Sequence, residues 1–515
     1  MTGPSIGVVG GGAAAVCLID ALARAQGEPG SITVFEPSPH LWRGRAYQAD
    51  TETIKVNATP DDMSVRVGDT GHFERWLDTR DRLVGGAPGH GVDPWSGARF
   101  APRTVYGEYL EQAAHAALGE LRAQGWRVDL VGAAVTAARR AADRVLLRTG
   151  NGSARAFDYV VLCVGGDSPK DVYGLARAPG FVADPYPVSR TLQEIRERDH
   201  VAVIGSGLTA VDIILALAAQ GHRGRISLLS RRGVLPAVRQ RPAHFELRHV
   251  TPARMRSLAR RRRTVTLDDV AGLVRAELRE AGADVDAVLS EILHADQEPP
   301  VDRLRRQLDA VGSADLGLRV LQRAVPETGP DIWPLLRERD RALILRDHYR
   351  TIMSLCCPMP PSSAAVLLGL ADEGRLVIRS GVQRVSARAD AGFDVVTSDG
   401  TTLGPDKVIN AVNASEGRIP TGALPLVTSL TRGRAASRHP HGGLDLVRST
   451  SRLTADGVPD PRLYGLGNIA AGALFFTFGI PSLVDRSEDI VAAILRHAAT
   501  GRTARPASEE VLLTA

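Results

Sequence analysis

The chain has 515 residues, too many for one hydrophobic core, so we expect two or three domains. Its 63 basic and 58 acidic residues leave a net charge of +5, and the basic residues are spread along the chain, not gathered with aromatic residues into one stripe. This distribution argues against nucleic-acid binding.

The cysteines and apolar runs narrow the class of protein further. Adjacent Cys356 and Cys357 cannot form the Cys-x-x-Cys pair of a dithiol enzyme, and Cys17 and Cys163 lie within apolar runs. No group of histidines and cysteines has the spacing of a metal site. The apolar run at 470–480 is too short to span a bilayer, and the first apolar run leads directly into glycines, without a secretory signal. We expect a cytoplasmic protein without a membrane anchor or a disulfide framework.

The chain begins with a strand–turn–helix–strand unit. Residues 5–9 are a short apolar run, three glycines follow at 10–12, and an alanine-rich helical stretch runs to residue 24. Residues 31–36 form a second strand-like run that ends on an acidic residue. This order is typical of the βαβ unit of a Rossmann fold.

The first glycine turn has the residue types that a dinucleotide requires. Gly10 allows the sharp turn, Gly12 leaves room for a pyrophosphate, and Ala15 lets the helix pack on its strand. Glu36 ends the second strand, where a carboxylate accepts hydrogen bonds from ribose hydroxyls. We therefore expect these four residues to bind FAD.

The same pattern returns at residue 201. An apolar run at 201–204 precedes a second turn with the same glycine spacing, and the next strand, at 225–230, ends in a serine and two arginines instead of an acid. A hydroxyl and two guanidinium groups match a 2′-phosphate, which a carboxylate would repel. The residues that we expect to bind NADPH are Gly205, Gly207, Ala210, Ser230, Arg231 and Arg232.

The rest of the sequence suggests how the chain is divided. Residues from about 240 to 350 are rich in arginine, leucine and acids with helical spacing. We predict an α/β protein with two Rossmann-type dinucleotide-binding domains and a mostly helical insertion. The FAD-binding domain would comprise residues 1–170 and 401–500, and the NADPH-binding domain residues 190–400, with the insertion at about 240–350 and a C-terminal tail at 501–515.

Several longer strings carry a family resemblance. Residues 43–47, 56–64, 201–212, 230–236 and 333–350 resemble the bacterial FAD-NAD(P)-binding family of YdhS type. The resemblance implies bound FAD and NADPH, and it places residues 43–64 in a loop that passes the flavin. The cofactor contacts expected in this loop are Arg45, Tyr47, Asn57, Met63 and Ser64.

Two further segments are expected at the flavin. Gly165 follows the predicted strand at 158–166 and would let the chain pass close to the cofactor. Two-dinucleotide flavoproteins often carry a late Gly-Asp pair that binds the ribityl or phosphate region. Here Gly467 is followed by Asn468, whose amide can still hydrogen-bond to a hydroxyl.

More distantly, the chain is similar to flavin monooxygenases that hydroxylate the nitrogen of amino acids. This similarity implies that the enzyme consumes NADPH and O₂, forms a flavin C4a-hydroperoxide and oxidises a small amine or amino acid. Two alternatives stay open: an NADPH-dependent flavin oxidoreductase with an organic acceptor, and a non-enzymatic flavin-bound redox sensor or partner protein.

Three residues are candidates for the substrate site. His348 and Arg350 lie on one predicted helix and could anchor an anionic group of the substrate. Phe476 lies in an apolar run that could exclude water from the flavin.

Overall fold

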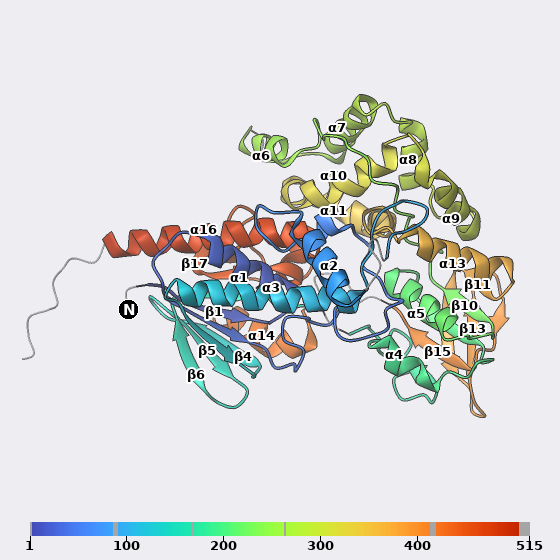
Figure 1. Cartoon of the computed structure of the whole chain (residues 1–515), viewed down its shortest axis with the longest axis horizontal. Coiled ribbons are helices and arrows are strands. Elements are labelled where there is room, and N and C mark those ends of the chain that lie inside the picture. Colours follow the sequence, from blue (N-terminus) through green and yellow to red (C-terminus); the bar gives the residue numbers. More distant parts are fainter. Residues whose placement is uncertain (1–2, 86–90, 167, 262–263, 413–418, 504–515) are drawn as a thin grey trace, which may run out of the picture.

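The computed structural model describes residues 3–85, 91–166, 168–261, 264–412 and 419–503. Two units lie side by side along the long axis, each built on its own mostly parallel sheet, with a helical region beside them (Figure 1). The predicted α/β class, with two Rossmann-type domains and a helical insertion, is confirmed.

The first unit contains a six-stranded sheet with the strand order β16-β17-β7-β1-β2-β3. Neighbouring strands are parallel, except that β16 runs antiparallel to β17. The inner strands are short apolar runs buried on both faces, as in a sheet covered on both sides. The strands are β1 (Ser5–Val9), β2 (Ser31–Phe35), β3 (Arg127–Val131), β7 (Tyr159–Leu162), β16 (Arg452–Ala455) and β17 (Val458–Gly465).

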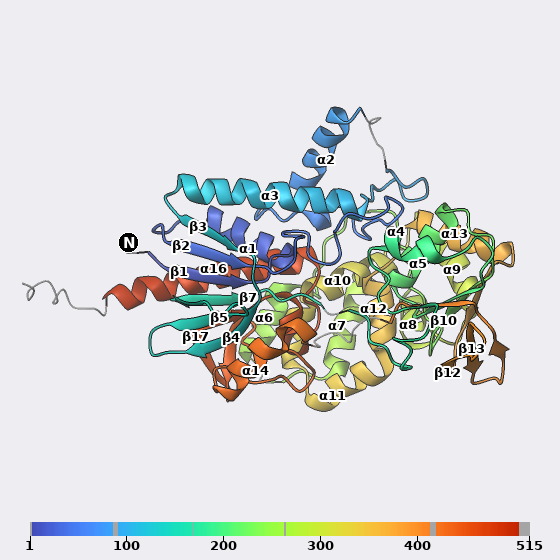
Figure 2. The ribbon, with the colours of Figure 1, turned by 90° about the horizontal axis from the view of Figure 1, so that it is seen from below.

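Helices cover one face of this sheet and a second, smaller sheet covers the other. The helical face consists of α1 (Ala13–Arg24), α3 (Arg103–Ala123) and α16 (Ile480–Thr503), which share one hydrophobic core. The opposite face packs against α14 (Leu424–Arg432) and the antiparallel strands β4 (Val135–Arg140), β5 (Val145–Thr149) and β6 (Ala154–Phe157). Helix α2 (His72–Leu83) projects from this unit (Figure 2).

The second unit contains a five-stranded parallel sheet with the order β11-β10-β9-β15-β8. Its strands are β8 (Phe181–Val182), β9 (Val201–Ile204), β10 (Ile226–Leu229), β11 (Leu376–Arg379) and β15 (Lys407–Asn410). Helices α5 (Leu208–Ala219) and α13 (Pro361–Asp372) pack on one face. The antiparallel strands β12 (Val382–Ala387), β13 (Phe393–Thr397) and β14 (Thr402–Leu403) pack on the other.

The domain boundaries differ from the predicted ones. Strand β15 pairs with β9 and β8 pairs with β15, so the second unit reaches from about residue 181 to residue 410, not from 190 to 400. An apolar run predicts a strand but not the sheet that the strand joins. At the other end of the chain, α16 continues to Thr503, so the predicted tail begins with helix; residues 504–515 lie outside the described residues.

The helical insertion connects β10 to α13 and lies along the upper side of the molecule in Figure 1. Its last helix ends at Cys356, beyond the predicted limit of 350. A π-helix at Ile344–His348 separates two of its α-helices. The helices are α6 (Pro252–Arg261), α7 (Leu267–Glu280), α8 (Val285–Leu293), α9 (Pro300–Asp309), α10 (Gly317–Ile332), α11 (Glu338–Leu343) and α12 (Tyr349–Cys356).

Candidate functional site

The first glycine turn is built tightly against a neighbouring strand. Gly10 follows β1 with a φ of +104°, which favours glycine. A Cβ on Gly10 would lie 2.4 Å from the carbonyl oxygen of Cys163, which follows β7. Only glycine therefore fits at this point, as the sequence predicted.

The N-terminus of α1 meets another glycine beside this turn. Gly12 is the N-cap of α1, and a Cβ there would meet only Gly44, at 3.5 Å from its Cα. The carboxylate of Glu36 accepts hydrogen bonds from the amides of Gly11 and Ser38, both at 2.8 Å, and is thereby fixed at the end of β2. A helix N-terminus beside a fixed carboxylate suits a pyrophosphate and an adjoining ribose.

The second glycine turn repeats this construction. Gly205 follows β9 with a φ of +116°, and a Cβ there would lie 2.4 Å from the carbonyl oxygen of Ala411, just after β15. Gly207 is the N-cap of α5, and the fully buried Ala210 packs this helix into the core. Ala15 has the same position and burial on α1. Both units can therefore present a helix N-terminus to a dinucleotide.

The residues after β10 do not share one role. The Ser230 hydroxyl accepts a hydrogen bond from the amide of Gly233 at 2.8 Å. Arg232 donates to the carbonyl oxygens of Asp347 and Arg346, at 2.6 and 2.9 Å, and so holds the π-helix. Arg231 is exposed and forms no ion pair within the described ranges. Both arginines are exposed, and their contact with a 2′-phosphate stays a prediction.

Arg350 lies at the second glycine turn. Its Nη2 donates to the carbonyl oxygens of Ser206 at 2.6 Å and Val234 at 3.1 Å. This part of the guanidinium braces the turn, and the contact of Arg350 with substrate stays a prediction. His348 ends the π-helix half-buried, and its contact with substrate stays a prediction.

Two residues of the predicted flavin loop contact the second unit or its helical insertion. Arg45 forms an ion pair with Asp184 at 2.5 Å. The carbonyl oxygen of Asn57 accepts a hydrogen bond from Nε of Arg239, at 2.7 Å. This loop therefore lies at the boundary between the units.

The other three loop residues pack inside the first unit. The ring of Tyr47 lies 4.7 Å, centroid to centroid, from that of Tyr106, whose hydroxyl donates to the carbonyl oxygen of Met63 at 2.9 Å. The Ser64 hydroxyl donates to the carbonyl oxygen of Asp69 at 2.6 Å and closes a turn. Flavin contact by these side chains stays a prediction.

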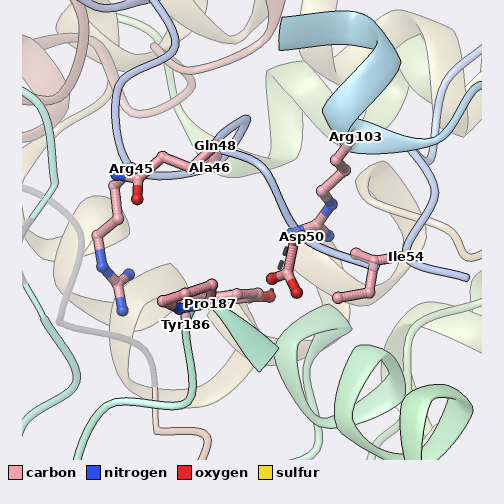
Figure 3. A pocket seen from close by; sticks show the side chains of 8 residues that line it. All are labelled: Arg45, Ala46, Gln48, Asp50, Ile54, Arg103, Tyr186 and Pro187. Atoms are coloured by element: carbon pink, nitrogen blue, oxygen red, sulfur yellow. Dashed lines mark hydrogen bonds between the residues drawn. The ribbon is translucent and has the colours of Figure 1, made fainter. Parts of the chain in front are cut away.

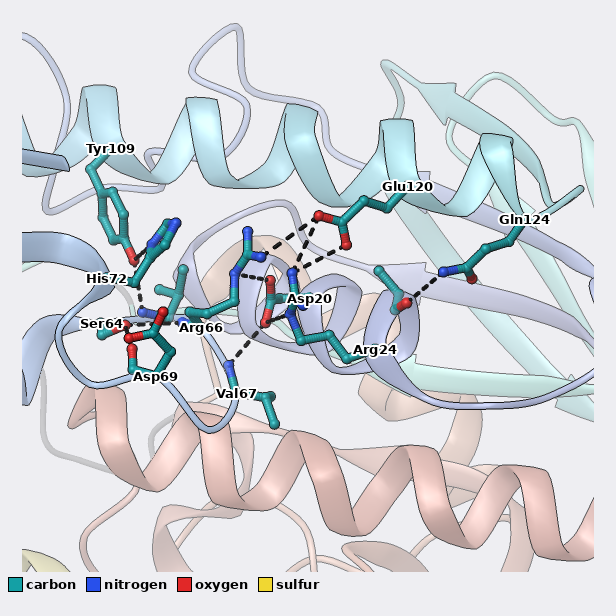
Figure 4. A network of polar contacts seen from close by, with 12 residues as sticks. Asp20, Arg24, Ser64, Arg66, Val67, Asp69, His72, Tyr109, Glu120 and Gln124 are labelled. Atoms are coloured by element: carbon teal, nitrogen blue, oxygen red, sulfur yellow. Dashed lines mark hydrogen bonds and ion pairs between the residues drawn. The ribbon is translucent and has the colours of Figure 1, made fainter. Parts of the chain in front are cut away.

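A buried carboxylate ties the end of this loop to α1. Asp20 is fully buried, accepts a hydrogen bond from the amide of Val67 at 3.0 Å and pairs with Arg66 at 3.0 Å (Figure 4). Arg24 lies 3.5 Å from the same carboxylate and also contacts Glu120 on α3. Burial raises the pKa of the Asp20 carboxyl to about 6, although the Val67 amide and Arg24 lower it.

The late glycine–asparagine pair reaches the first turn from another part of the chain. Gly467 has a φ of +80°, and a Cβ there would lie 3.7 Å from Cβ of Ala14, at the start of α1. The side-chain amide of Asn468 donates to the carbonyl oxygen of Gly165 at 3.4 Å. The structure thus brings Gly165, Gly467 and Asn468 together beside the predicted FAD turn.

The aromatic segment before α16 packs against the insertion. The rings of Phe475 and Trp333 stack with centroids 4.7 Å apart, and the Trp333 indole donates to the carbonyl oxygen of Gly472 at 2.8 Å. Phe476 is only 4% exposed and belongs to the same apolar cluster. This cluster joins the insertion to the first unit.

Sequence reasoning missed Trp42, which lies against the first glycine turn. Its amide donates to the carbonyl oxygen of Gly11 at 2.6 Å, and its φ of +72° is unusual for a large residue. The ring is 1% exposed, and its Nε1 has no hydrogen-bond partner in the part of the chain that the structure describes. The adjoining Gly44 was the one signal in the sequence, because paired glycines at 12 and 44 allow the two segments to meet.

Two kinds of feature are absent from the described residues. No helix in these ranges is long and apolar enough to cross a membrane. Nor do three or more potential metal-ligating side chains of the described residues form a group.

The comparisons with known proteins agree with this geometry. Residues 7–167 match a family model described as FAD-NAD(P)-binding, which confirms the expected similarity to such proteins. No curated protein sequence matches the chain.

Solved structures resemble the whole chain. The ornithine hydroxylase of Pseudomonas aeruginosa is 16% identical, with a TM-score of 0.55 over 96% of this chain and 99% of that one. The L-lysine 6-monooxygenase of Pseudomonas syringae is 14% identical, with a TM-score of 0.53 over 96% and 100%. The FAD-bound cadaverine monooxygenase of Erwinia amylovora is 11% identical, with a TM-score of 0.56 over 100% and 98%. At these identities the likeness establishes the fold.

Proposed function

We propose that the chain is an FAD-dependent, NADPH-consuming monooxygenase that oxidises a nitrogen of a small amine or amino acid. The observation that carries the proposal is the pair of equivalent glycine turns, one on each parallel sheet. Support comes from the fold, which is shared along the whole chain with hydroxylases of ornithine, lysine and cadaverine.

The first unit has the groups that FAD requires. The N-terminus of α1 at Gly12 would hold the pyrophosphate, and Glu36 would accept hydrogen bonds from the ribose. The Asn468 amide, beside Gly165, would donate to the ribityl region. Trp42, whose backbone amide contacts this turn, also carries a buried Nε1 without a partner among the described residues. When bound, FAD supplies the redox chemistry by accepting a hydride from NADPH, which becomes NADP⁺, and passing the electrons to O₂.

The second unit has the groups that NADPH requires. The N-terminus of α5 at Gly207 would hold the pyrophosphate, braced by Arg350 through the Ser206 carbonyl. The exposed guanidinium of Arg231 would bind the 2′-phosphate, a contact that NADH cannot make. This arrangement favours NADPH over NADH.

The thiols argue against dithiol chemistry. Cys17 and Cys163 are buried, and burial raises the pKa of both thiols well above its usual range, so they are poor nucleophiles. Cys356 and Cys357 are adjacent and unlinked. Since none of the four cysteines, which all lie in the described ranges, forms a disulfide, we also propose a reducing, cytoplasmic location.

The aromatic cluster around Phe475, Phe476 and Trp333 would keep water away from the reduced flavin. Excluding water matters in a monooxygenase, because reduced oxygen that escapes leaves as hydrogen peroxide instead of entering the product.

The test is an amine screen on the purified holoenzyme. NADPH consumption and hydroxylamine formation are measured with L-ornithine, L-lysine and cadaverine, and with norvaline and norleucine, which lack the side-chain amines of the two amino acids. The proposal predicts that at least one of the three amines raises both rates together and that norvaline and norleucine raise neither. NADPH consumption that depends on an organic acceptor, with no hydroxylamine from any amine, would favour the plain oxidoreductase.

A further inference from the structure

A small cleft between the two units is lined by charged and aromatic side chains that have no part in the proposed function. Arg103 is the first residue of α3 in the first unit, Asp212 lies on α5 in the second, and Tyr186 lies between β8 and β9 of the second unit. Figure 3 shows Arg103, Tyr186 and Asp50 converging in this cleft.

The side chains of Arg103, Asp212 and Tyr186 form a closed ring of polar contacts. Nη2 of Arg103 pairs with Oδ2 of Asp212 at 2.8 Å, and Nη1 donates to the Tyr186 hydroxyl at 3.1 Å. The Tyr186 hydroxyl in turn donates to Oδ2 of Asp212 at 2.5 Å. Nε of Arg103 donates to the carbonyl oxygen of Lys55 at 3.3 Å, so one guanidinium joins three segments of the chain.

These charges are largely removed from water. The side chains of Arg103 and Asp212 are 16% and 6% exposed. Burial raises the pKa of Asp212 to about 6, and Arg103 and Tyr186 lower it. Burial by itself would lower the pKa of Arg103, but Asp212 and Tyr186 raise it. Because a buried charge without its partner is costly, the units have a strong preference for the one orientation that keeps the ring closed.

The flavin loop makes further contacts with the residues between β8 and β9. The Asp50 carboxylate accepts hydrogen bonds from the amides of Val188 and Ser189, both at 2.7 Å, at the start of α4 (Val188–Thr191). The guanidinium carbons of Arg45 and Arg103 lie 5.4 and 5.9 Å from the centre of the Tyr186 ring. The connection is therefore made by several independent contacts, with Arg103 at its centre.

This connection reaches the second glycine turn through a single helix. Asp212 lies five residues after Gly207, which is ~7.5 Å along α5. Fixing Asp212 against the first unit therefore fixes the turn that would hold the NADPH pyrophosphate. Hydride transfer needs donor and acceptor atoms about 3–3.5 Å apart, and a displacement of about 1 Å can cost 100-fold in rate.

We propose that Arg103, Asp212 and Tyr186 are positioning residues for hydride transfer, because they hold the two dinucleotide-binding units in the orientation that brings the nicotinamide to the flavin. The proposal rests on the proposed function for the identity of the two cofactors. In the step concerned, NADPH loses a hydride and becomes NADP⁺, and FAD gains that hydride and a proton from solvent.

The test compares Arg103→Gln with Arg80→Gln. Arg80 pairs with Glu108 at 2.7 Å entirely within the first unit, so its loss removes an ion pair of similar geometry without touching the boundary. The readouts are FAD content, the dissociation constant for NADPH, and the rate of flavin reduction at saturating NADPH without oxygen.

For Arg103→Gln we expect unchanged FAD content, an NADPH dissociation constant within about threefold of wild type, and flavin reduction slower by roughly 10- to 100-fold. Arg103→Lys should restore part of the rate, and adding Asp212→Asn to Arg103→Gln should cause little further loss, because both changes open the same ring. Arg80→Gln should behave as wild type. Wild-type reduction by Arg103→Gln, or an equal loss in Arg80→Gln, would overturn the proposal.

Two additions keep the test decisive. If Arg103→Gln does not fold, Tyr186→Phe removes one hydroxyl from the ring and should still slow reduction several-fold; an unchanged rate there counts against the proposal. Hydrogen exchange of the amides of residues 181–192 reads the connection without NADPH, and it should quicken in Arg103→Gln but not in Arg80→Gln. If NADPH fails to reduce the wild-type flavin, the proposed function is wrong, whereas unchanged exchange refutes the positioning role itself.

Discussion

Replacing Gly12 by alanine separates FAD binding from folding. Gly12 has φ −98° and ψ −163°, an extended conformation that any residue adopts. The added Cβ would lie 3.5 Å from Cα of Gly44, an ordinary contact. Losing glycine at this N-cap costs about 1 kcal/mol, which is small beside the roughly 5–15 kcal/mol that stabilises a folded domain. The variant should therefore fold.

The same methyl group would stand where the pyrophosphate approaches α1. If it displaces the phosphates from two backbone amides, each charge-assisted hydrogen bond lost costs roughly 1.5–3 kcal/mol. Together these losses would raise the FAD dissociation constant by about 100-fold or more. The holoenzyme should be yellow and the Gly12→Ala protein colourless.

The assay is flavin absorbance per chain after gel filtration, with circular dichroism to monitor folding. Gly207→Ala is the matched control, because it alters the equivalent N-cap of the second unit and should retain FAD while weakening NADPH binding. Gly10→Ala should lose the fold instead, since its Cβ would lie 2.4 Å from the Cys163 carbonyl oxygen. A folded Gly12→Ala protein with wild-type FAD content would refute the assignment of this turn.

Further variants test other parts of the account. Arg231→Gln should raise KM for NADPH about tenfold or more by removing a charge-assisted contact to the 2′-phosphate, and leave KM for NADH unchanged; equal effects on both would show a structural role. Phe476→Ala should open the aromatic cluster, so that more NADPH is consumed per hydroxylamine formed and peroxide appears; unchanged coupling would contradict a role in excluding water. The pKa of Asp20 is raised to about 6 in the folded protein, whereas it is near 4 in the unfolded chain. Asp20 therefore stabilises the fold fully below pH 4, and this contribution is lost as the pH rises through 6. Relative to Asp20→Asn, the wild-type free energy of unfolding should therefore fall by up to about 3 kcal/mol between pH 4 and 7, as read by denaturant titration, whereas parallel curves would show that Asp20 does not titrate there.

The two glycine turns could be predicted because their signals are local. A strand, a glycine turn, a helix and an acid follow one another between residues 5 and 36, and Glu36 lies where this spacing places it. Chain connectivity does not reveal long-range partners. The sequence predicts that Arg350 lies on a helix. Its contact with Ser206 spans 144 residues and depends on how the insertion packs against the second glycine turn.

The connection between the units lay beyond prediction for the same reason. Asp212 follows the second glycine turn in sequence, but nothing local shows that it pairs with Arg103 or that Tyr186 completes the ring. The two arginines after β10 also look alike in sequence. Only the fold shows that Arg232 donates to backbone carbonyls of the insertion, whereas Arg231 forms no ion pair within the described ranges.

Turnover under ¹⁸O₂, with the amine that best stimulates NADPH consumption, shows whether the protein inserts oxygen into an amine. The product should be a hydroxylamine that carries one ¹⁸O atom, formed with one NADPH oxidised, and it should carry no label when ¹⁸O is supplied as water. NADPH oxidation that proceeds equally well without oxygen and yields a reduced organic product would contradict oxygen insertion.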